Sequence, residues 1–247
     1  MSLSVTVLGS SGSYASTENP CTGYLLRSAD AAVLLDCGPG TLGPLQREID
    51  PADLTAVVLT HCHPDHWLEL PVLRNVLTWF SPRDGLPVYG TAVTREMDHD
   101  VTVPAEDRAD PLRWTTIDST SEIEVGDLRL RFALTDHPVE TLAVRVDNCD
   151  ATFAFSSDTG PTWSFDSLGA GIDLAFCDAS HLSTEENRGI PHMSAREAGA
   201  LGRAADVGRL VVTHLVPGSD PDAHRAEASE AYGGPVDVAL PGLDFDV

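Results

Sequence analysis

Three histidines and one aspartate fall within six residues of this sequence, in the segment Thr60-His61-Cys62-His63-Pro64-Asp65-His66-Trp67. The preceding run, Ala56–Thr60, is apolar and β-branched and is typical of a buried strand. Side chains alternate along an extended segment, so His61 and His63 project to the same side and can bind one cation. A proline then turns the chain, which directs Asp65 and His66 toward a second cation. Imidazole and carboxylate ligands suit zinc and its borderline neighbours.

Cys62 lies between two of these histidines, but the same alternation points its side chain away from them. We therefore interpret Cys62 as a small core residue and not as a ligand. An accidental histidine cluster on a surface turn is the alternative interpretation of the whole segment. The apolar strand in front of the cluster argues against it.

Four further polar residues each follow a predicted strand. They are Asp36 in Asp36-Cys37-Gly38-Pro39-Gly40, His137, Asp158 in Ser156-Ser157-Asp158-Thr159-Gly160, and His214. Open sheets place ligand sites at strand ends, so we expect these side chains to converge on one site. Taken singly, each has a simpler interpretation, such as a surface histidine or a turn-forming aspartate. Their order and their shared position at strand ends favour a common site.

The pattern H-x-H-x-D-H after a strand, the early D-x-G turn and the later His, Asp and His motifs resemble the metallo-β-lactamase fold superfamily over essentially the whole chain. The resemblance implies an α/β (α+β) protein with a four-layer αββα architecture, in which two mixed β-sheets are sandwiched between helices. We expect one domain over residues 1–247. Periodicity alone supports only an α/β or α+β class.

The resemblance also implies a dinuclear centre with two zinc ions, manganese or iron being the alternatives. His61, His63 and His137 would hold the first ion, Asp65, His66 and His214 the second, and Asp158 would bridge them. A hydroxide between the ions would be the nucleophile. Asp65 and His192 are the predicted catalytic residues, whereas we expect Asp36 to fix the turn or to support a ligand.

Composition bounds the remaining possibilities. The chain has 247 residues, 42% of them hydrophobic, which is enough for a large core. No run of 18 apolar residues predicts a membrane span. The N-terminal residues show no signal peptide, and the five cysteines are scattered without a C-x-x-C pair. We therefore expect a cytoplasmic protein in a reducing compartment.

The chain is strongly acidic, with a formal net charge of −23, and all 15 basic residues are arginines. Such a surface repels polyanions, so a large nucleic acid is a poor substrate candidate and a small molecule a better one. Only 21 positions separate His137 from Asp158, which leaves no room for the arm with which RNase Z grips tRNA.

Strands and helices alternate along the sequence. The predicted strands cover 4–8, 22–27, 32–36, 56–60, 87–90, 114–117, 122–125, 128–135, 142–146, 152–155, 172–177, 209–212 and 236–239. The predicted helices cover 42–49, 67–79 with a bend near Pro71, 91–98, 163–170, 194–205 and 222–232. Ser194 and Glu197 form the sequence pattern of a capping box, and Gly126-Asp127 that of a hairpin turn.

Two segments favour a phosphodiester substrate. The loop after the first strand contains Ser10, Ser11, Gly12 and Ser13, whose backbone N–H groups could receive an anion if they are free. It resembles the early loop of the RNase Z-like and cyclic-nucleotide phosphodiesterase branches, although a plain flexible turn is equally compatible. His192 precedes a helix N-terminus and, by the same resemblance, would contact phosphate and protonate the leaving group.

Asp178, in Cys177-Asp178-Ala179-Ser180, stands where those branches usually carry Glu, which leaves its proton-relay role open; His181 is a further pocket candidate. The leading hypothesis is a phosphodiesterase acting on a small substrate such as a cyclic nucleotide. Alternatives are an acyl hydrolase for a lactone, thioester or β-lactam, a tRNA 3′-processing endonuclease, and a non-hydrolytic metal protein. The apolar helix 67–79 could form a homodimer interface, but core packing explains its pattern somewhat better.

Overall fold

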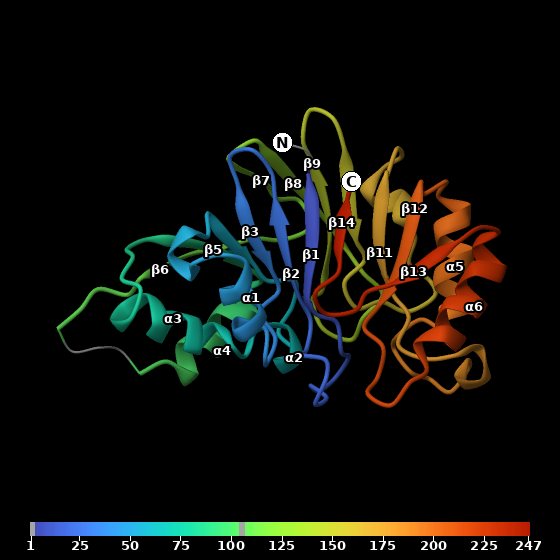
Figure 1. Cartoon of the computed structure of the whole chain (residues 1–247), viewed down its shortest axis with the longest axis horizontal. Coiled ribbons are helices and arrows are strands. Elements are labelled where there is room, and N and C mark those ends of the chain that lie inside the picture. The colour runs from blue at the N-terminus through green and yellow to red at the C-terminus, as the bar shows by residue number, and fades with distance from the viewer. Residues whose placement is uncertain (1–2, 104–106) are drawn as a thin grey trace.

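The computed structural model describes residues 3–103 and 107–247. Two sheets of seven strands each pack face to face, and helices cover both outer faces (Figure 1). This layering confirms the predicted αββα fold with two mixed sheets. None of the helices in the described part of the chain has the length and apolarity that a bilayer crossing requires.

The first sheet has the strand order β14-β1-β2-β3-β4-β5-β6. Its strands are β1 (Ser4–Gly9), β2 (Gly23–Arg27), β3 (Ala32–Leu35), β4 (Ala56–Val58), β5 (Leu86–Gly90), β6 (Leu112–Thr116) and β14 (Asp244–Asp246). Strands β3 to β6 run parallel, whereas β1 pairs antiparallel with both β2 and β14. The parallel strands β3 and β4 therefore end at the same edge, immediately before Asp36 and the histidine cluster.

The second sheet has the order β13-β12-β11-β10-β9-β8-β7. Its strands are β7 (Glu122–Val125), β8 (Leu128–Leu134), β9 (Leu142–Asp147), β10 (Thr152–Phe155), β11 (Leu174–Asp178), β12 (Arg209–Thr213) and β13 (Val236–Val238). Strands β10 to β13 are parallel, so Asp158, Asp178 and His214 also gather at one edge. Val125 pairs with Leu128 across Gly126-Asp127, which confirms the predicted hairpin turn.

Alternation along the strands divides the apolar side chains among three layers. On β10, Phe153 and Phe155 point into the core between the sheets, whereas Ala154 faces the helices outside. Tyr24, from the opposite sheet, packs edge-on against Phe155 with ring centroids 5.2 Å apart. The central core is thus built from bulky residues of both sheets, and it holds the two ligand-bearing edges in register.

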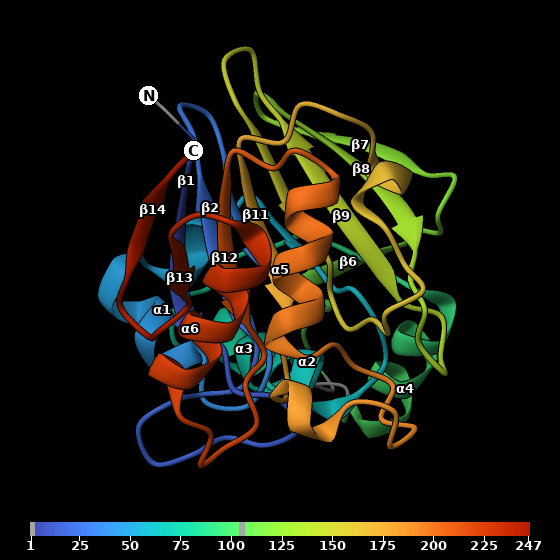
Figure 2. The same ribbon diagram turned by 90° about the vertical axis from the view of Figure 1, so that its right-hand side faces the viewer.

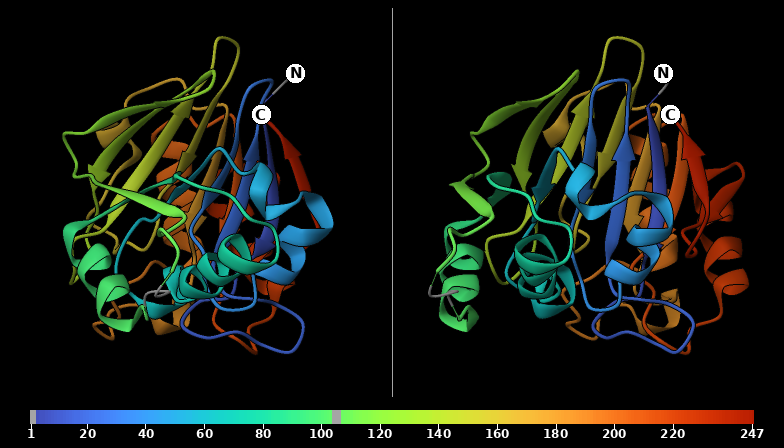
Figure 3. Two further views of the ribbon diagram at one scale, coloured as in Figure 1. Left: turned by 90° about the vertical axis from the view of Figure 1, so that its left-hand side faces the viewer. Right: turned by 60° about the vertical axis from the view of Figure 1, so that its left-hand side comes forward.

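The helices are α1 (Leu42–Glu48), α2 (Pro64–Trp67), α3 (Leu70–Trp79), α4 (Ala92–Val101), α5 (Ala195–Ala204) and α6 (Pro221–Tyr232), with 3₁₀ turns η1 (Pro51–Asp53), η2 (Phe165–Leu168) and η3 (Ser183–Glu185). Helices α1, α3 and α4 cover the first sheet (Figure 3), and α5 and α6 lie side by side on the second (Figure 2). The capping box of Ser194 and Glu197 at the start of α5 is confirmed.

Several predicted elements differ from the structure. The predicted helix 67–79 is two helices, α2 and α3, separated at residues 68–69, and the bend therefore precedes Pro71. The predicted helix 163–170 is only the 3₁₀ turn η2, and β14 was not predicted at all. Strand β4 ends at Val58, two residues before the predicted end, so His61 and His63 lie in the loop that follows.

Candidate metal centre

The seven predicted ligand residues lie together at the edge where the parallel strands of both sheets end. Their side-chain donor atoms form two groups, each with its atoms within 4.8 Å of one another: His61, His63, His137 and Asp158, and Asp65, His66 and His214. Cys62 is in neither group, which agrees with its interpretation as a core residue. Because β4 stops at Val58, the loop geometry and not strand alternation brings His61 and His63 together.

Asp158 lies between the two groups. Its Oδ2 is 3.4 Å from Nε2 of His61, and its Oδ1 is 3.1 Å from Nε2 of His66 and 3.4 Å from Nε2 of His214. One carboxylate oxygen thus faces each group of donors. This is the arrangement a bridging ligand requires.

Two buried polar atoms in this cluster test whether the residues fit a metal. Nε2 of His61 and Oδ1 of Asp158 are fully buried, yet neither has a hydrogen-bond partner within the described residues. Burying a polar atom without a hydrogen-bond partner costs folding free energy. A cation bound among the neighbouring donor atoms would give both of these atoms a partner. Imidazole and carboxylate donors in these numbers suit a divalent transition metal.

The charge states of the donors favour the same interpretation. Burial and the neighbouring His66 lower the pKa of His61 to about 3, and burial also lowers the pKa of His63 and His137. Burial opposes ionisation of Asp158, but the nearby imidazoles of His214 and His66 outweigh it and hold the pKa of this carboxyl well below its usual range. Neutral imidazoles and an ionised carboxylate are the forms that bind metals.

The second ring nitrogen of several histidines is held by a neighbouring group. Nδ1 of His66 donates to Oδ2 of Asp36 (2.7 Å), Nδ1 of His214 lies 2.9 Å from the hydroxyl of Ser180, and Nδ1 of His137 lies 3.1 Å from the carbonyl of Pro191. These contacts leave Nε2 of each ring for the cluster. Such outer partners fix the tautomer and orientation of a ligating imidazole.

Asp36 holds the predicted ligand His66 and the neighbouring Thr60 by hydrogen bonds, which is the supporting role that the sequence predicts. Its Oδ1 accepts a hydrogen bond from the backbone N–H of Thr60, and its Oδ2 accepts one from the Thr60 hydroxyl as well as from His66. Asp36 and His214 have left-handed backbone angles, with φ of 59° and 62°. Non-glycine residues rarely adopt this conformation, and it concentrates at functional sites.

The backbone of the predicted anion-binding loop is already used. The N–H groups of Ser10, Ser11, Gly12 and Ser13 donate to Oδ1 of Asn19, to the carbonyls of Pro20 and Leu215, and to Oδ2 of Asp65, respectively. The prediction of free N–H groups for an anion is therefore wrong. The loop instead positions Asp65, because Ser13 donates to it at 2.7 Å.

His192 lies beside the metal-centre residues and is held by Asp178. Its Nδ1 is 2.8 Å from Oδ2 of Asp178, and its ring stacks on that of His214 with centroids 5.1 Å apart. Burial alone lowers the pKa of His192, but the charge and hydrogen bond of the fully buried Asp178 outweigh burial and raise this pKa to about 9. Asp178 thus reaches His192 although it is one methylene shorter than the Glu typical of this position.

Sequence reasoning missed three supporting groups: Thr60, Ser180 and the carbonyl of Pro191. Ser180 follows β11, which carries Asp178, and Thr60 directly precedes the histidine cluster, so their positions were a usable signal. Nothing in the sequence marks a backbone carbonyl such as that of Pro191. His181 donates no atom to either predicted donor group, and its Nδ1 is buried without a hydrogen-bond partner among the described residues.

Comparison with known proteins gives one family and several relatives. Residues 31–215 match the family described as "Beta-lactamase superfamily domain". An uncharacterized protein of Mycobacterium tuberculosis is 32% identical over 100% of this chain and 93% of its own length. A ribonuclease Z of Mycobacterium bovis is 30% identical over 96% of this chain and 95% of its own length.

One solved structure is similar over its whole length. The crystal structure of the metallo-beta-lactamase fold protein YhfI from Bacillus subtilis superposes with a TM-score of 0.90, at 26% identity, and each chain is covered completely. The match includes every strand that carries a residue of the candidate metal centre.

Proposed function

Since this chain belongs to the beta-lactamase superfamily and is a metallo-hydrolase of that fold, we propose that it cleaves a phosphodiester bond in a small substrate, such as a cyclic nucleotide. His61, His63 and His137 would hold one zinc ion, Asp65, His66 and His214 a second, and Asp158 both. Bound cations of this kind would activate water at neutral pH and neutralise charge on the group under attack.

The observation that carries this proposal is the pair formed by His192 and Asp178. Nδ1 of His192 is committed to Asp178 at 2.8 Å, which leaves Nε2 as the nitrogen that can donate a proton. The charge and hydrogen bond of Asp178 raise the pKa of this imidazole and so favour its protonated form. A poor leaving group such as an alkoxide requires a proton donor, so we assign His192 as the general acid and Asp178 as the residue that positions it.

The surroundings support a small substrate over a folded RNA. The net charge of −23 opposes binding of a polyanion. Between His137 and Asp158 the chain forms only β9 and β10 with their connecting turns. Although one relative is named ribonuclease Z, this chain builds no projecting arm in that interval with which to hold a tRNA.

The reaction is tested with metal-loaded protein and four substrates: bis-p-nitrophenyl phosphate, cyclic AMP, a lactone and a thioester. We expect turnover of the phosphodiesters, and a loss of about 100-fold or more in the His192→Ala variant with metal content unchanged. Arg47→Ala is the control, because Arg47 is exposed on α1 and lies outside the candidate centre.

Acyl hydrolysis is the competing outcome, because the same metal-ligand set would serve it. In addition, the backbone N–H groups of residues 10–13 are already hydrogen-bonded and cannot bind a phosphate. Turnover of the lactone or thioester alone would contradict the proposal. So would phosphodiester turnover that His192→Ala leaves unchanged.

A further inference from the structure

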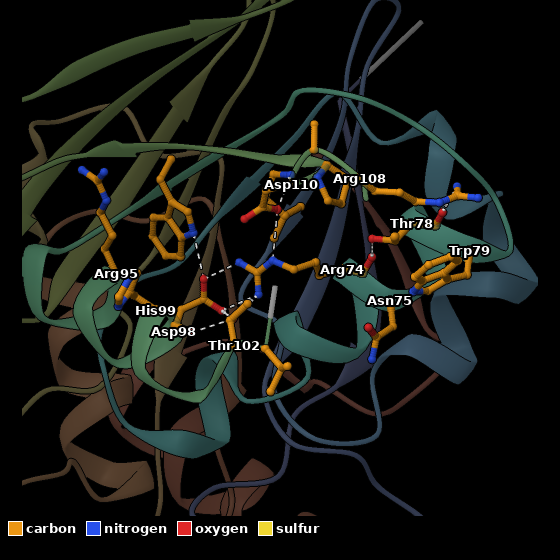
Figure 4. A pocket seen from close by; sticks show the side chains of 15 residues that line it. Arg74, Asn75, Thr78, Trp79, Arg95, Asp98, His99, Thr102, Arg108 and Asp110 are labelled. Carbon is orange, nitrogen blue, oxygen red and sulfur yellow. Dashed lines mark hydrogen bonds and ion pairs between the residues drawn. The ribbon is translucent and has the colours of Figure 1, made fainter. Parts of the chain in front are cut away.

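A second cavity lies away from the candidate metal centre, between α3, α4 and the start of β6 (Figure 4). Its volume is about 670 Å³, and no residue that lines it belongs to the predicted ligand set. Cavities of this size bind small organic molecules. We propose that this cavity is a binding site for a small aromatic anion, a planar ring that carries a carboxylate or a similar acidic group.

The floor of the cavity is a charge network that is buried at Arg74 and Asp98 and about half exposed at Asp110. Arg74 is only 7% exposed; its Nη1 donates to Oδ1 of Asp98 at 3.0 Å and its Nε to Oδ1 of Asp110 at 3.1 Å. Nε1 of Trp114 also donates to Asp98, at 3.0 Å. The two carboxylates among the lining residues, those of Asp98 and Asp110, therefore already accept hydrogen bonds from residues of this network. The network gives the cavity a fixed shape and leaves the recognition of a ligand to other residues.

One wall of the cavity is formed by an arginine stacked on an indole ring. Trp79 is 53% exposed, and the guanidinium of Arg108 lies over its ring at 4.4 Å from the centroid. Nη1 of Arg108 donates to the carbonyl of Thr78, which keeps the guanidinium in place. A guanidinium has five N–H donors, so it can hold this carbonyl and still receive an anion.

A second exposed arginine lies across the cavity from this wall. Figure 4 shows Arg95 and His99 of α4 on the side of the cavity opposite Trp79 and Arg108. A planar ring in this cavity would therefore have an arginine on each of two opposite walls. This combination of an indole face with guanidinium donors matches an aromatic anion better than a neutral apolar molecule.

The charge balance of the lining supports an anion. Acidic residues outnumber basic ones by 38 to 15 in the whole chain. Among the described residues that line the cavity, the three arginines 74, 95 and 108 outnumber the two acidic residues, Asp98 and Asp110. A small basic concavity on an acidic protein selects anions small enough to enter it, since the surrounding surface repels larger ones.

Calorimetry with three probes that share one ring system tests the charge and the ring separately. The probes are 2-naphthoate, the neutral 2-naphthalenemethanol and the cationic 2-naphthylmethylammonium. We expect 2-naphthoate to bind about tenfold more tightly than the alcohol and the ammonium probe to bind least. The first titrations are done in EDTA, so that the carboxylate of 2-naphthoate cannot bind to a metal ion. They are then repeated with zinc-loaded protein, for which we expect the same affinity.

Matched variants assign the binding to this cavity. The double variant Arg95→Ala/Arg108→Ala should lose the preference for 2-naphthoate, whereas Arg47→Ala, an exposed arginine on α1, should keep it. Trp79→Ala should weaken both 2-naphthoate and the alcohol by about tenfold or more. Phe80→Ala is its control, because Phe80 is the next residue, is 81% exposed and does not line the cavity.

Several results would overturn this assignment. They are equal affinity for the three probes, no measurable binding, binding that requires zinc, or equal effects of the cavity variants and their controls. A change of oligomeric state in Trp79→Ala without a change in probe affinity would identify the face as a contact between copies of the chain instead. None of these results depends on which bond the metal centre hydrolyses.

Discussion

The hydroxyl of Ser180 lies 2.9 Å from Nδ1 of His214 and donates to Oδ1 of Asp178 at 2.8 Å. Because the other oxygen of Asp178 holds His192, one buried carboxylate is connected to a predicted metal ligand and to the proposed general acid. The proposed metal binding and the proposed proton transfer therefore both depend on Asp178. Disturbing that carboxylate should affect metal binding and proton transfer together.

We expect Ser180→Ala to weaken metal binding by about 10- to 100-fold, because Nδ1 of His214 loses the group that orients it. Competition with a chromophoric chelator measures this affinity without reference to turnover. Ser180→Thr keeps the hydroxyl and should restore most of the affinity. Ser167→Ala, an exposed serine in η2, is the control; an equal loss in Ser167→Ala, or no loss in Ser180→Ala, would contradict the role.

The pH dependence of turnover should report the contact between Asp178 and His192. Asp178 raises the pKa of His192 to about 9, and nearby cations would lower this value, so about 9 is an upper bound for metal-loaded protein. Only the protonated ring can act as a general acid. On its alkaline side, turnover is therefore expected to fall as the pH rises through the pKa of His192.

In Asp178→Asn the pKa of His192 should drop, and the alkaline fall in turnover should move to lower pH. The effect is then small near about pH 6 and large near about pH 8, which a general loss of structure would not produce. Asp166→Asn, at an exposed position in η2, should leave the profile unchanged. An alkaline limb that stays in place in Asp178→Asn would show that Asp178 does not set this pKa.

Removal of the metals should destabilise the fold. Without cations, the cluster keeps three aspartates, Asp36, Asp65 and Asp158, buried close together. A ligand present at a thousandfold excess over its Kd stabilises the native state by about 4 kcal/mol. We therefore expect EDTA to lower the melting temperature and zinc to restore it. An unchanged melting curve after metal analysis confirms removal would count against a metal centre at this edge.

The part of the site that was predictable from the sequence is the part encoded by local patterns. The predicted ligands follow strand ends, and parallel strands of one sheet end at one edge, so the strand pattern predicted that Asp158 and His214 lie close together. That His61, from the other sheet, joins them was implied by the family resemblance. The loop after β1 was mispredicted for a non-local reason. Its N–H groups donate to the Asn19 side chain and to the carbonyls of Pro20 and Leu215. No local sequence pattern predicts these hydrogen-bond partners.

The same limit explains the errors in the fold. Strand β14 exists because Phe245 pairs with Val5, about the full length of the chain away, and three residues carry too little periodicity to indicate it. The break between α2 and α3 follows from a tertiary contact. The N–H of Glu69 donates to the carbonyl of Cys37 in the D-x-G turn instead of continuing the helix.

That turn also provides a test in which two glycines are compared. A Cβ on Gly38 would lie 2.0 Å from the carbonyl oxygen of Asp65, so Gly38→Ala must displace α2, which carries Asp65 and His66. We expect a loss of about tenfold or more in metal affinity, since misplaced ligands bind poorly. A Cβ on Gly43 in α1 meets no atom within 4 Å. Gly43→Ala should therefore leave metal affinity unchanged. Chelator competition measures the metal affinity of both variants; equal metal affinity in Gly38→Ala and wild type would show that the D-x-G turn does not position α2.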